Sequence, residues 1–206
     1  MVFYMETAHT RPIWTYIIIA VCVAMFIIQQ ITPSNSWEIL AFWPVYAVVF
    51  PWSFVTAIFL HAGIDHLVFN MIALLFFGYT LENMLGRKIF LIIFFLSGII
   101  GNVGYLLTSF IGLTDFYTPA IGASGAIYGI IGTLVILIPL RSVYLYGLFP
   151  IPLVFVVAFW LLLDIIGLFA PSGIANGAHL GGIVFGAICG FYIRKRMSIR
   201  YSYTIV

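Results

Sequence analysis

Six apolar runs dominate the sequence, and each is long enough to cross a lipid bilayer. The hydrocarbon core of a membrane is about 30 Å thick, which a helix crosses in roughly 20 residues. Most runs end at turn-forming or basic residues, as membrane-spanning helices do. We therefore expect an all-α integral membrane protein with six transmembrane helices. The runs cover residues 13–31, 66–85, 89–112, 124–140, 147–169 and 176–193.

The composition excludes a water-soluble globular protein. Of the 206 residues, 64% are hydrophobic and only 7% are charged, whereas a soluble domain has about 25% charged residues. The net charge of +2 gives no reason to expect nucleic-acid binding. Cys22 and Cys189 lie inside apolar runs, so we interpret them as small core residues and not as a disulfide pair. The first run is too long for a signal-peptide core, and we expect it to be retained.

Residues 33–65 do not fit a spanning helix. They are apolar and rich in tryptophan and phenylalanine, but Pro44 and Pro51 interrupt them. Tryptophan favours the depth of the membrane interface. We therefore predict a long interfacial first loop over 33–65. The alternative is a seventh span over about 39–60.

The basic residues fix the predicted orientation. Cytoplasmic loops of membrane proteins carry an excess of lysine and arginine. With six spans and a cytoplasmic N-terminus, all 8 basic residues lie on the cytoplasmic side, whereas a seventh span would place three of them outside. We therefore expect an N-terminal tail (1–12), a six-helix domain (13–193) and a basic C-terminal tail (194–206), with both tails cytoplasmic. The basic residues are Arg11, Arg87, Lys88, Arg141, Arg194, Lys195, Arg196 and Arg200.

Four polar side chains are predicted to lie at one depth, slightly below the outer membrane surface. His66 and Asn70 open the second run, Ser124 opens the fourth, and His179 lies near the start of the sixth. These three runs all cross the membrane from outside to inside. Polar groups inside a membrane are costly, and they are usually functional or bond one helix to another. The spacing of four between His66 and Asn70 puts them on one helix face.

Small residues predict that the fourth and sixth runs pack closely. Such stripes let helix backbones approach one another. If the two stripes face each other, Ser124 and His179 come within reach, with Tyr128 one turn below the serine. The stripes are Gly125 and Gly129 on the fourth run, and Ala178, Gly182, Gly186 and Gly190 on the sixth.

These residue types suit acyl transfer. A serine hydroxyl becomes a good nucleophile when a base, most often histidine, takes its proton. The oxyanion then needs hydrogen-bond donors, which Asn70, His66 and the free N–H groups of Ala123 and Ser124 at the helix start could supply. Each residue alone is more often explained by packing or interhelical bonding. Their convergence at one depth favours a serine-type hydrolase.

Asp164 is a carboxylate inside the fifth apolar run. It could be a third member of the catalytic group or a proton-relay residue. The fifth run crosses from inside to outside, and nothing in the spacing requires Asp164 to reach His179, so we expect no catalytic role. The helical zinc signature H-E-x-x-H is absent, and we expect no metal and no cofactor.

Three segments resemble the signatures of rhomboid intramembrane serine proteases. They are "HAGIDHLVFN" (61–70), "GASGAIYG" (122–129) and "NGAHLGGIVFG" (176–186). They occur in the family's order and on the expected second, fourth and sixth spans. The resemblance covers about residues 12–195, which is nearly all of the chain.

The resemblance implies a Ser–His dyad, with Ser124 as nucleophile and His179 as general base, and no acidic third member. It also implies an oxyanion hole from His66, Asn70 and the backbone around Ala123 and Ser124. Gly122 matches the glycine two residues before the serine. Tyr128 matches the aromatic residue that stacks under the catalytic histidine.

Other positions match the family by their place in the chain. Glu82 matches a structural glutamate that anchors the first loop. Trp160 and Phe169 resemble the aromatic residues of a fifth-helix substrate gate, although that match is loose. The family's first loop usually carries a Trp-Arg pair, whereas Trp52 is followed here by Ser53. That departure puts the anchoring of the loop to lipid headgroups in doubt.

We therefore expect an intramembrane serine endopeptidase that cleaves transmembrane protein substrates near the outer face of a prokaryotic cell membrane. Its partners would be those substrates and the lipid bilayer, with no nucleic acid. The sequence does not indicate the oligomeric state. Two other classes stay open: a transporter or proton channel with Asp164, His66 and His179 as a relay, and a non-catalytic binder of membrane proteins.

Overall fold

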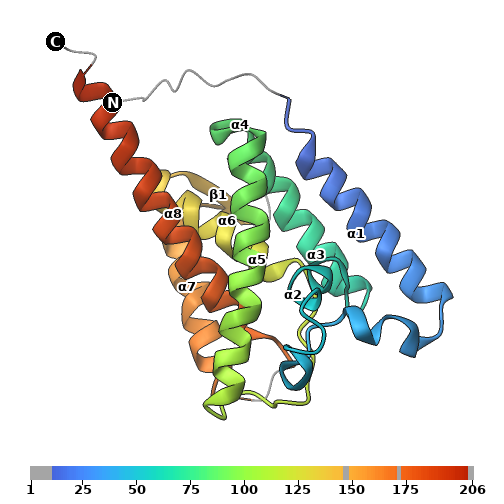
Figure 1. The fold of residues 1–206 in the computed structure, drawn as a ribbon. Coiled ribbons are helices and arrows are strands. Elements are labelled where there is room, and N and C mark those ends of the chain that lie inside the picture. The colour runs from blue at the N-terminus through green and yellow to red at the C-terminus, as the bar shows by residue number, and fades with distance from the viewer. Residues whose placement is uncertain (1–10, 146–148, 171–172, 204–206) are drawn as a thin grey trace.

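The computed structural model describes residues 11–145, 149–170 and 173–203, and most of them are helical (Figure 1). Four helical segments have the length and hydropathy to cross a membrane: Trp14–Ile31, Ile64–Leu85, Arg87–Phe110 and Asn176–Met197. Two further apolar helices are shorter, Ser124–Leu137 and Leu153–Gly167. The chain is therefore a multi-pass membrane protein.

The helices follow the predicted runs closely in the first half of the chain. The segment 64–85 is one continuous helix whose middle turn is π-helical. The elements are α1 (Trp14–Ile31), α3 (Ile64–Ala73), the π-turn η4 (Leu74–Gly78), α4 (Tyr79–Leu85), α5 (Arg87–Phe110), α6 (Ser124–Leu137), α7 (Leu153–Gly167) and α8 (Asn176–Tyr203).

Helices α6 and α8 pack backbone against backbone. A β-carbon at Gly182 would collide with the carbonyl oxygen of Gly125, and one at Gly186 would collide with that of Gly129. The two stripes of small residues therefore do face each other. Helix α5 joins the same contact, because a β-carbon at Gly104 would lie 2.5 Å from the carbonyl oxygen of Gly177. This close approach positions the start of α6 beside the start of α8.

Residues 34–59 form short helical turns and no helix of spanning length. The elements are η1 (Ser34–Leu40), η2 (Pro44–Tyr46), α2 (Ser53–Thr56) and η3 (Ala57–Phe59), and the longest has 7 residues. The alternative of a seventh span over 39–60 is therefore wrong. Prolines at 44 and 51 lack the N–H that a continuous helix requires.

Hydrogen bonds hold this loop against the helices. Gln29 on α1 donates from Nε2 to the carbonyl of His61 (3.2 Å) and accepts the His61 N–H (3.0 Å). Asn102 on α5 donates to the carbonyl of Phe54 (2.9 Å). Phe42 and Ala120 form an isolated antiparallel bridge. These contacts tie the loop to α1, to α5 and to the segment that precedes Ser124.

The fifth apolar run does not begin as a helix. Its first described residues form β2 (Phe149–Pro152), which pairs antiparallel with β1 (Ser142–Leu145) in the register Ser142↔Pro152. Pro150 and Pro152 cannot donate the backbone bonds of a helix interior, and Pro152 caps α7, which begins at Leu153. The predicted start of this span at 147 was therefore too early; residues 146–148 lie outside the described part of the chain.

The last helix is longer than predicted. Helix α8 continues through the basic run 194–196 to Tyr203, whereas we expected it to end at 193. Long basic side chains can keep their charged ends in water while their stems lie along a helix, so a basic run need not end one.

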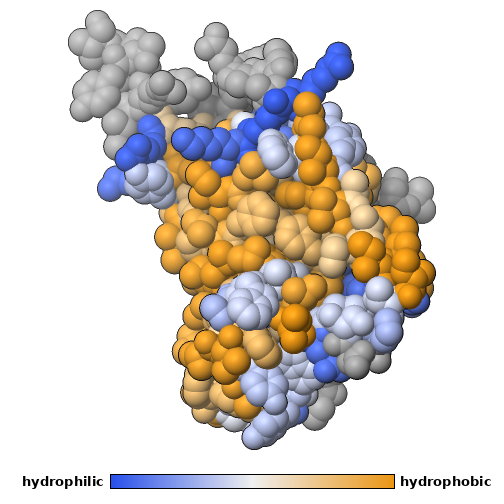
Figure 2. All heavy atoms as spheres, turned by 45° about the vertical axis from the view of Figure 1, so that its right-hand side comes forward, coloured by the Kyte–Doolittle hydropathy of each residue, from blue (hydrophilic) through white to orange (hydrophobic). Residues whose placement is uncertain are grey.

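The surface has the band expected of a membrane protein. Figure 2 shows apolar side chains over the middle of the face in view, with hydrophilic residues above them. Large exposed apolar side chains lie on several helices. They include Phe69 and Phe76 on the second span, Phe155 and Leu162 on α7, and Phe191 on α8. Contiguous apolar surface of this extent is typical of contact with lipid.

Candidate active site

The side chains of Ser124 and His179 lie within hydrogen-bonding distance. Ser124 is the first residue of α6, after Ala123 at the cap position, and His179 lies in the first turn of α8. The Ser124 Oγ is 2.9 Å from Nε2 of His179. The glycine contact between α6 and α8 brings together two residues that are 55 positions apart in the chain.

Tyr128 lies one helical turn below Ser124 and stacks on the imidazole. The ring centroids of Tyr128 and His179 are 4.2 Å apart and their planes differ by 12°. Tyr128 also contacts Trp160, with centroids 6.3 Å apart. The stacking limits rotation of the His179 ring about its side-chain bonds.

Asp164 on α7 contacts the other nitrogen of the same imidazole. Its Oδ1 is 2.7 Å from Nδ1 of His179. Asp164 was considered as a possible third member of the catalytic group, but no catalytic role was expected for it, and the family resemblance implied a dyad without an acidic residue. In the sequence, the only sign of this contact was an isolated carboxylate within an apolar run. A charged group is costly inside a membrane and usually has a partner there.

His66 and Asn70 lie on the α3 side of the site, against Gly122. Gly122 has a φ of +121°, and a β-carbon there would be 2.7 Å from Cε1 and 2.8 Å from Nε2 of His66. The Ala62 N–H donates to Nδ1 of His66 (3.4 Å). An accepting Nδ1 leaves the proton of neutral His66 on Nε2, which faces Gly122.

Asn70 uses one hydrogen of its amide within its own helix, because Nδ2 donates to the His66 carbonyl (3.0 Å). The side-chain amide has a second hydrogen to offer. The first N–H groups of α6 have no partner within that helix. They begin directly after Ala123, which is fully buried, so these donors lie inside the protein. Donors from α3 and from the α6 N-terminus thus lie on the two sides of Gly122.

His61 supports this region and was not predicted as part of it. Its ring packs edge-on against His66, with centroids 5.3 Å apart, and it is only 1% exposed. Burial, and secondarily the neighbouring His66, lowers the pKa of His61 to about 4. His61 is therefore neutral at physiological pH.

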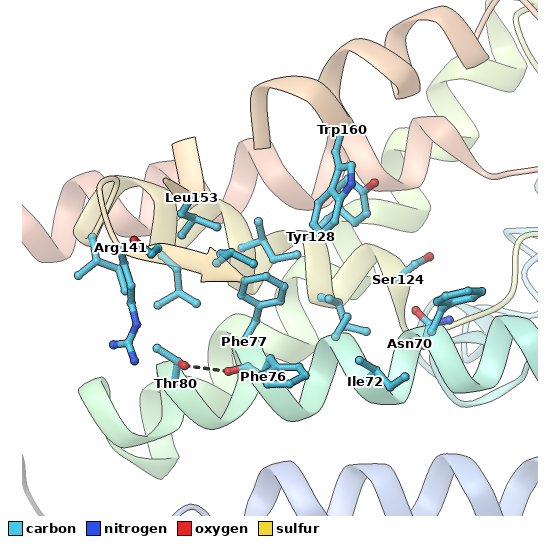
Figure 3. Close-up of a pocket in the computed structure, with 18 of the residues that line it drawn as sticks. Asn70, Ile72, Phe76, Phe77, Thr80, Ser124, Tyr128, Arg141, Leu153 and Trp160 are labelled. Atoms are coloured by element: carbon cyan, nitrogen blue, oxygen red, sulfur yellow. Dashed lines mark hydrogen bonds between the residues drawn. The ribbon is translucent and has the colours of Figure 1, made fainter. Parts of the chain in front are cut away.

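A long apolar groove opens beside the serine. It has a volume of about 810 Å³ and runs between the second-span helix on one side and α6, β1 and α7 on the other. Figure 3 shows Ser124 and Asn70 at one end and Arg141 and Thr80 at the other. Its walls include Phe69, Ile72, Phe76, Phe77, Ile131, Leu153 and Trp160.

The two predicted gate residues differ in position. Trp160 lines the groove and contacts Phe77 across it, with ring centroids 6.4 Å apart. Phe169 follows the end of α7, is 73% exposed and does not line the groove. The structure thus brings Trp160, but not Phe169, to the groove.

Glu82 binds α1 and not the first loop. Its carboxylate accepts hydrogen bonds from the N–H groups of Trp14 (3.0 Å) and Thr15 (2.8 Å) and from the Thr15 hydroxyl (2.8 Å). A carboxylate suits the positive end of a helix and its unpaired N–H groups. The expected anchoring of the loop by Glu82 is replaced by the contacts of Gln29 and Asn102.

Ser53, which stands where the family usually has arginine, is buried at the start of α2. Trp52 beside it donates from its indole N–H to the carbonyl of Ile39 (2.9 Å). Cys22 and Cys189 are both free. Within the described ranges, no three His, Cys, Asp or Glu side chains are grouped so as to hold a metal ion.

Comparison with known proteins identifies the family. Residues 50–196 match the rhomboid domain. The chain is 33% identical over 150 residues to the putative rhomboid protease YdcA of Bacillus subtilis (strain 168), covering 73% of this chain and 71% of that protein.

Two further relatives are longer than the matched region. The rhomboid protease GluP of Bacillus subtilis (strain 168) is 31% identical over 183 residues, covering 85% of this chain and 34% of GluP. The rhomboid protease GlpG of Klebsiella pneumoniae (strain 342) is 27% identical over 196 residues, covering 92% of this chain and 66% of GlpG. The domain match extends over more than half of the sequence and includes all three signature segments. The chain therefore belongs to the rhomboid family of intramembrane proteases.

Proposed function

We propose that the protein is a serine endopeptidase that hydrolyses a peptide bond in or near the transmembrane segment of other membrane proteins. The observation that carries the proposal is the 2.9 Å contact between Ser124 Oγ and His179 Nε2 at the end of an apolar groove. A nucleophile beside a base, next to a cavity that suits an apolar chain, is the arrangement that acyl transfer requires.

The reaction follows from the atoms in place. His179 Nε2 removes the hydroxyl proton as Ser124 Oγ attacks the scissile carbonyl carbon. The negative oxygen of the tetrahedral intermediate receives hydrogen bonds from His66 Nε2–H, the Asn70 amide and the backbone around Ala123 and Ser124. His179 then protonates the leaving amine. Water then attacks the acyl-enzyme carbonyl carbon while His179 takes a proton from the water. His179 returns this proton to Ser124 Oγ as the acyl group leaves, which regenerates the serine.

The groove indicates the class of substrate. Its lining is mostly apolar, with His66, Asn70 and Ser124 at one end and Thr80, Arg141 and Ser142 at the other. The peptide bonds of an α-helix are shielded by their own hydrogen bonds, so the segment to be cut must unwind at the serine. Substrates with Gly, Ser or Pro near the scissile bond would unwind most readily, because these residues favour the helix less than alanine or leucine do.

We place six spans in the membrane, with both tails cytoplasmic and the serine opening toward the outside of a prokaryotic cell. The positive-inside distribution of lysine and arginine supports this orientation. It can be tested by labelling single cysteines in a variant that lacks Cys22 and Cys189. Tyr117→Cys should react with an impermeant maleimide in intact cells, and Lys88→Cys only after permeabilisation; the reverse pattern contradicts the orientation.

The central test is labelling of purified protein by a fluorophosphonate, together with cleavage of a model transmembrane substrate in proteoliposomes. Ser124→Ala and His179→Ala should reduce cleavage by at least about 10³-fold, and Ser124→Ala should abolish labelling. Ser36→Ala is the control, because Ser36 is an exposed serine of the first loop that does not line the groove; it should retain both activities. Cleavage that persists in folded Ser124→Ala protein would show that another nucleophile acts.

A further inference from the structure

We propose that Asp164 is a positioning residue for His179, so that this rhomboid uses a Ser124–His179–Asp164 triad. The proposal rests on the proposed function, because it assigns a third member to the same catalytic group. It starts from two distances on one imidazole: 2.7 Å from Nδ1 to Asp164 Oδ1 and 2.9 Å from Nε2 to Ser124 Oγ.

The two contacts define the tautomer of His179. A carboxylate accepts hydrogen bonds, so the proton of neutral His179 is on Nδ1. Nε2 then carries the lone pair and faces the serine hydroxyl, as a general base must. With no acceptor at Nδ1, the other tautomer would place a proton on Nε2, which cannot take a second one from Ser124.

The third contact on the ring completes its placement. Tyr128 stacks on the imidazole face at 4.2 Å, while Asp164 and Ser124 hold its two nitrogens. The ring is thus fixed from α6, α7 and α8 together. Removing the carboxylate leaves the stacking in place but removes the acceptor that keeps the proton on Nδ1.

The close packing of α7 against α8 brings Asp164 and His179 together. A β-carbon at Gly167 would lie 2.5 Å from Nδ2 of Asn176, so the end of α7 touches the beginning of α8. Asp164 lies one turn before Gly167, and His179 lies one turn after Asn176. The missing side chain at position 167 therefore lets the two helices approach where the carboxylate meets the imidazole.

Burial explains what the carboxylate does during the reaction. Asp164 is 4% exposed and His179 is 9% exposed. When His179 takes the serine proton, it becomes a cation in a region that water screens poorly, where a nearby negative charge is more strongly stabilising than in water.

The test is the kinetics of Asp164→Asn with a transmembrane substrate in proteoliposomes. Asparagine keeps the size of the side chain and removes its charge. We expect kcat to fall on the order of 10²–10⁴-fold, KM to change less than about threefold, and the thermal midpoint to stay within a few degrees. Ile165→Val is the control, since Ile165 is the adjacent α7 residue and is 48% exposed; its kcat should match that of the wild type.

A spectroscopic measurement separates positioning from a structural role. In protein labelled with ¹⁵N-histidine, wild type and Ser124→Ala should both show a slowly exchanging, far-downfield Nδ1–H proton for His179. That signal should disappear in Asp164→Asn. If Asp164→Asn also loses thermal stability, the His179 signal of the remaining folded protein decides: a retained signal overturns the proposal, and a lost signal supports it.

The outcomes distinguish the triad from the protease function itself. If Ser124→Ala and His179→Ala abolish cleavage while Asp164→Asn stays within about threefold of wild type, the triad is overturned and the protease proposal stands. If folded Ser124→Ala protein still cleaves, the proposed function itself fails, whatever Asp164→Asn does.

Discussion

Gly122 lies directly against the imidazole of His66. A β-carbon at this position would be 2.8 Å from Nε2 of His66, and the backbone of Gly122 has a φ of +121°. The N–H of Gly122 donates to the carbonyl of Ala57 (2.9 Å). One residue thus joins the first loop to the segment that carries Ser124, and it leaves just enough space for His66.

Gly122→Ala should reduce cleavage at least about tenfold, because the added methyl group displaces a proposed oxyanion donor. It should also destabilise the fold by about 1–3 kcal/mol through backbone strain. Gly112→Ala is the matched control: Gly112 has a φ of +76° but nothing within 4 Å of its β-carbon position. Both variants should lose thermal stability, and only Gly122→Ala should lose kcat beyond its folded fraction. Equal kcat losses would remove the special role of the His66 contact.

Gly186→Ala should separate α6 from α8, because its methyl group would collide with the carbonyl oxygen of Gly129. Overpacking of this kind typically costs about 1–3 kcal/mol. Since Ser124 and His179 lie on these two helices, cleavage should fall with stability. Thermal unfolding in detergent and the cleavage rate measure the two effects. Val184→Ala, on a 58% exposed position of the same helix, should change neither; equal losses in both variants would show that the glycine contact is not specific.

Glu82→Gln should detach the start of α1. The carboxylate accepts three hydrogen bonds from Trp14 and Thr15, and a glutamine amide presents only one accepting oxygen. Hydrogen bonds to a charged group contribute about 1.5–3 kcal/mol, so a loss on the order of 2 kcal/mol is expected. Hydrogen exchange of the α1 N–H groups should increase. Glu38→Gln replaces an exposed loop carboxylate and serves as the control; unchanged α1 exchange in Glu82→Gln would contradict the assignment.

His61 should make stability fall as the pH is lowered. Its pKa is lowered from 6.5 to about 4 by burial and, secondarily, by His66. Below pH 6.5 the unfolded chain therefore binds a proton that the folded protein excludes until about pH 4. This difference reduces the free energy of unfolding across that window by about 3 kcal/mol at most. The thermal midpoint of His61→Phe between pH 7 and pH 4 should fall less steeply than that of the wild type; parallel curves would exclude His61 as a source of the pH dependence.

Hydropathy alone predicted most of the helices, because membrane thickness sets their length. The runs that start at 13, 66, 89, 124 and 176 correspond to helices within two residues at their first residue. Spacing also predicted that the glycines of α6 and α8 face each other. That prediction succeeded because close backbone approach requires small residues on one face, and the sequence shows this directly.

Other features depend on three-dimensional context that spacing cannot supply. Pro150 and Pro152 remove backbone donors, and the chain before α7 forms a hairpin instead of a helix. Hydropathy alone predicts that the same residues are part of a span. The partner of Glu82 lies 67 residues earlier in the chain, so no local pattern names it. Asp164 reaches His179 because Gly167 admits Asn176 at the α7–α8 contact, and the sequence does not show which helices meet there.

Asp164 lies on a helix that also forms part of the groove wall, so the geometry of the proposed triad depends on the position of α7. Ser124 and His179 are held by the glycine contact of α6 and α8, whereas Asp164 shares α7 with Trp160 and Leu153, which form part of the groove wall. An outward displacement of α7 that widened the groove would also stretch the 2.7 Å contact to Nδ1. In the proposed triad, the hydrogen bond that keeps the His179 proton on Nδ1 is therefore complete only while α7 is closed against α8, which ties the geometry of the proposed base to the width of the groove.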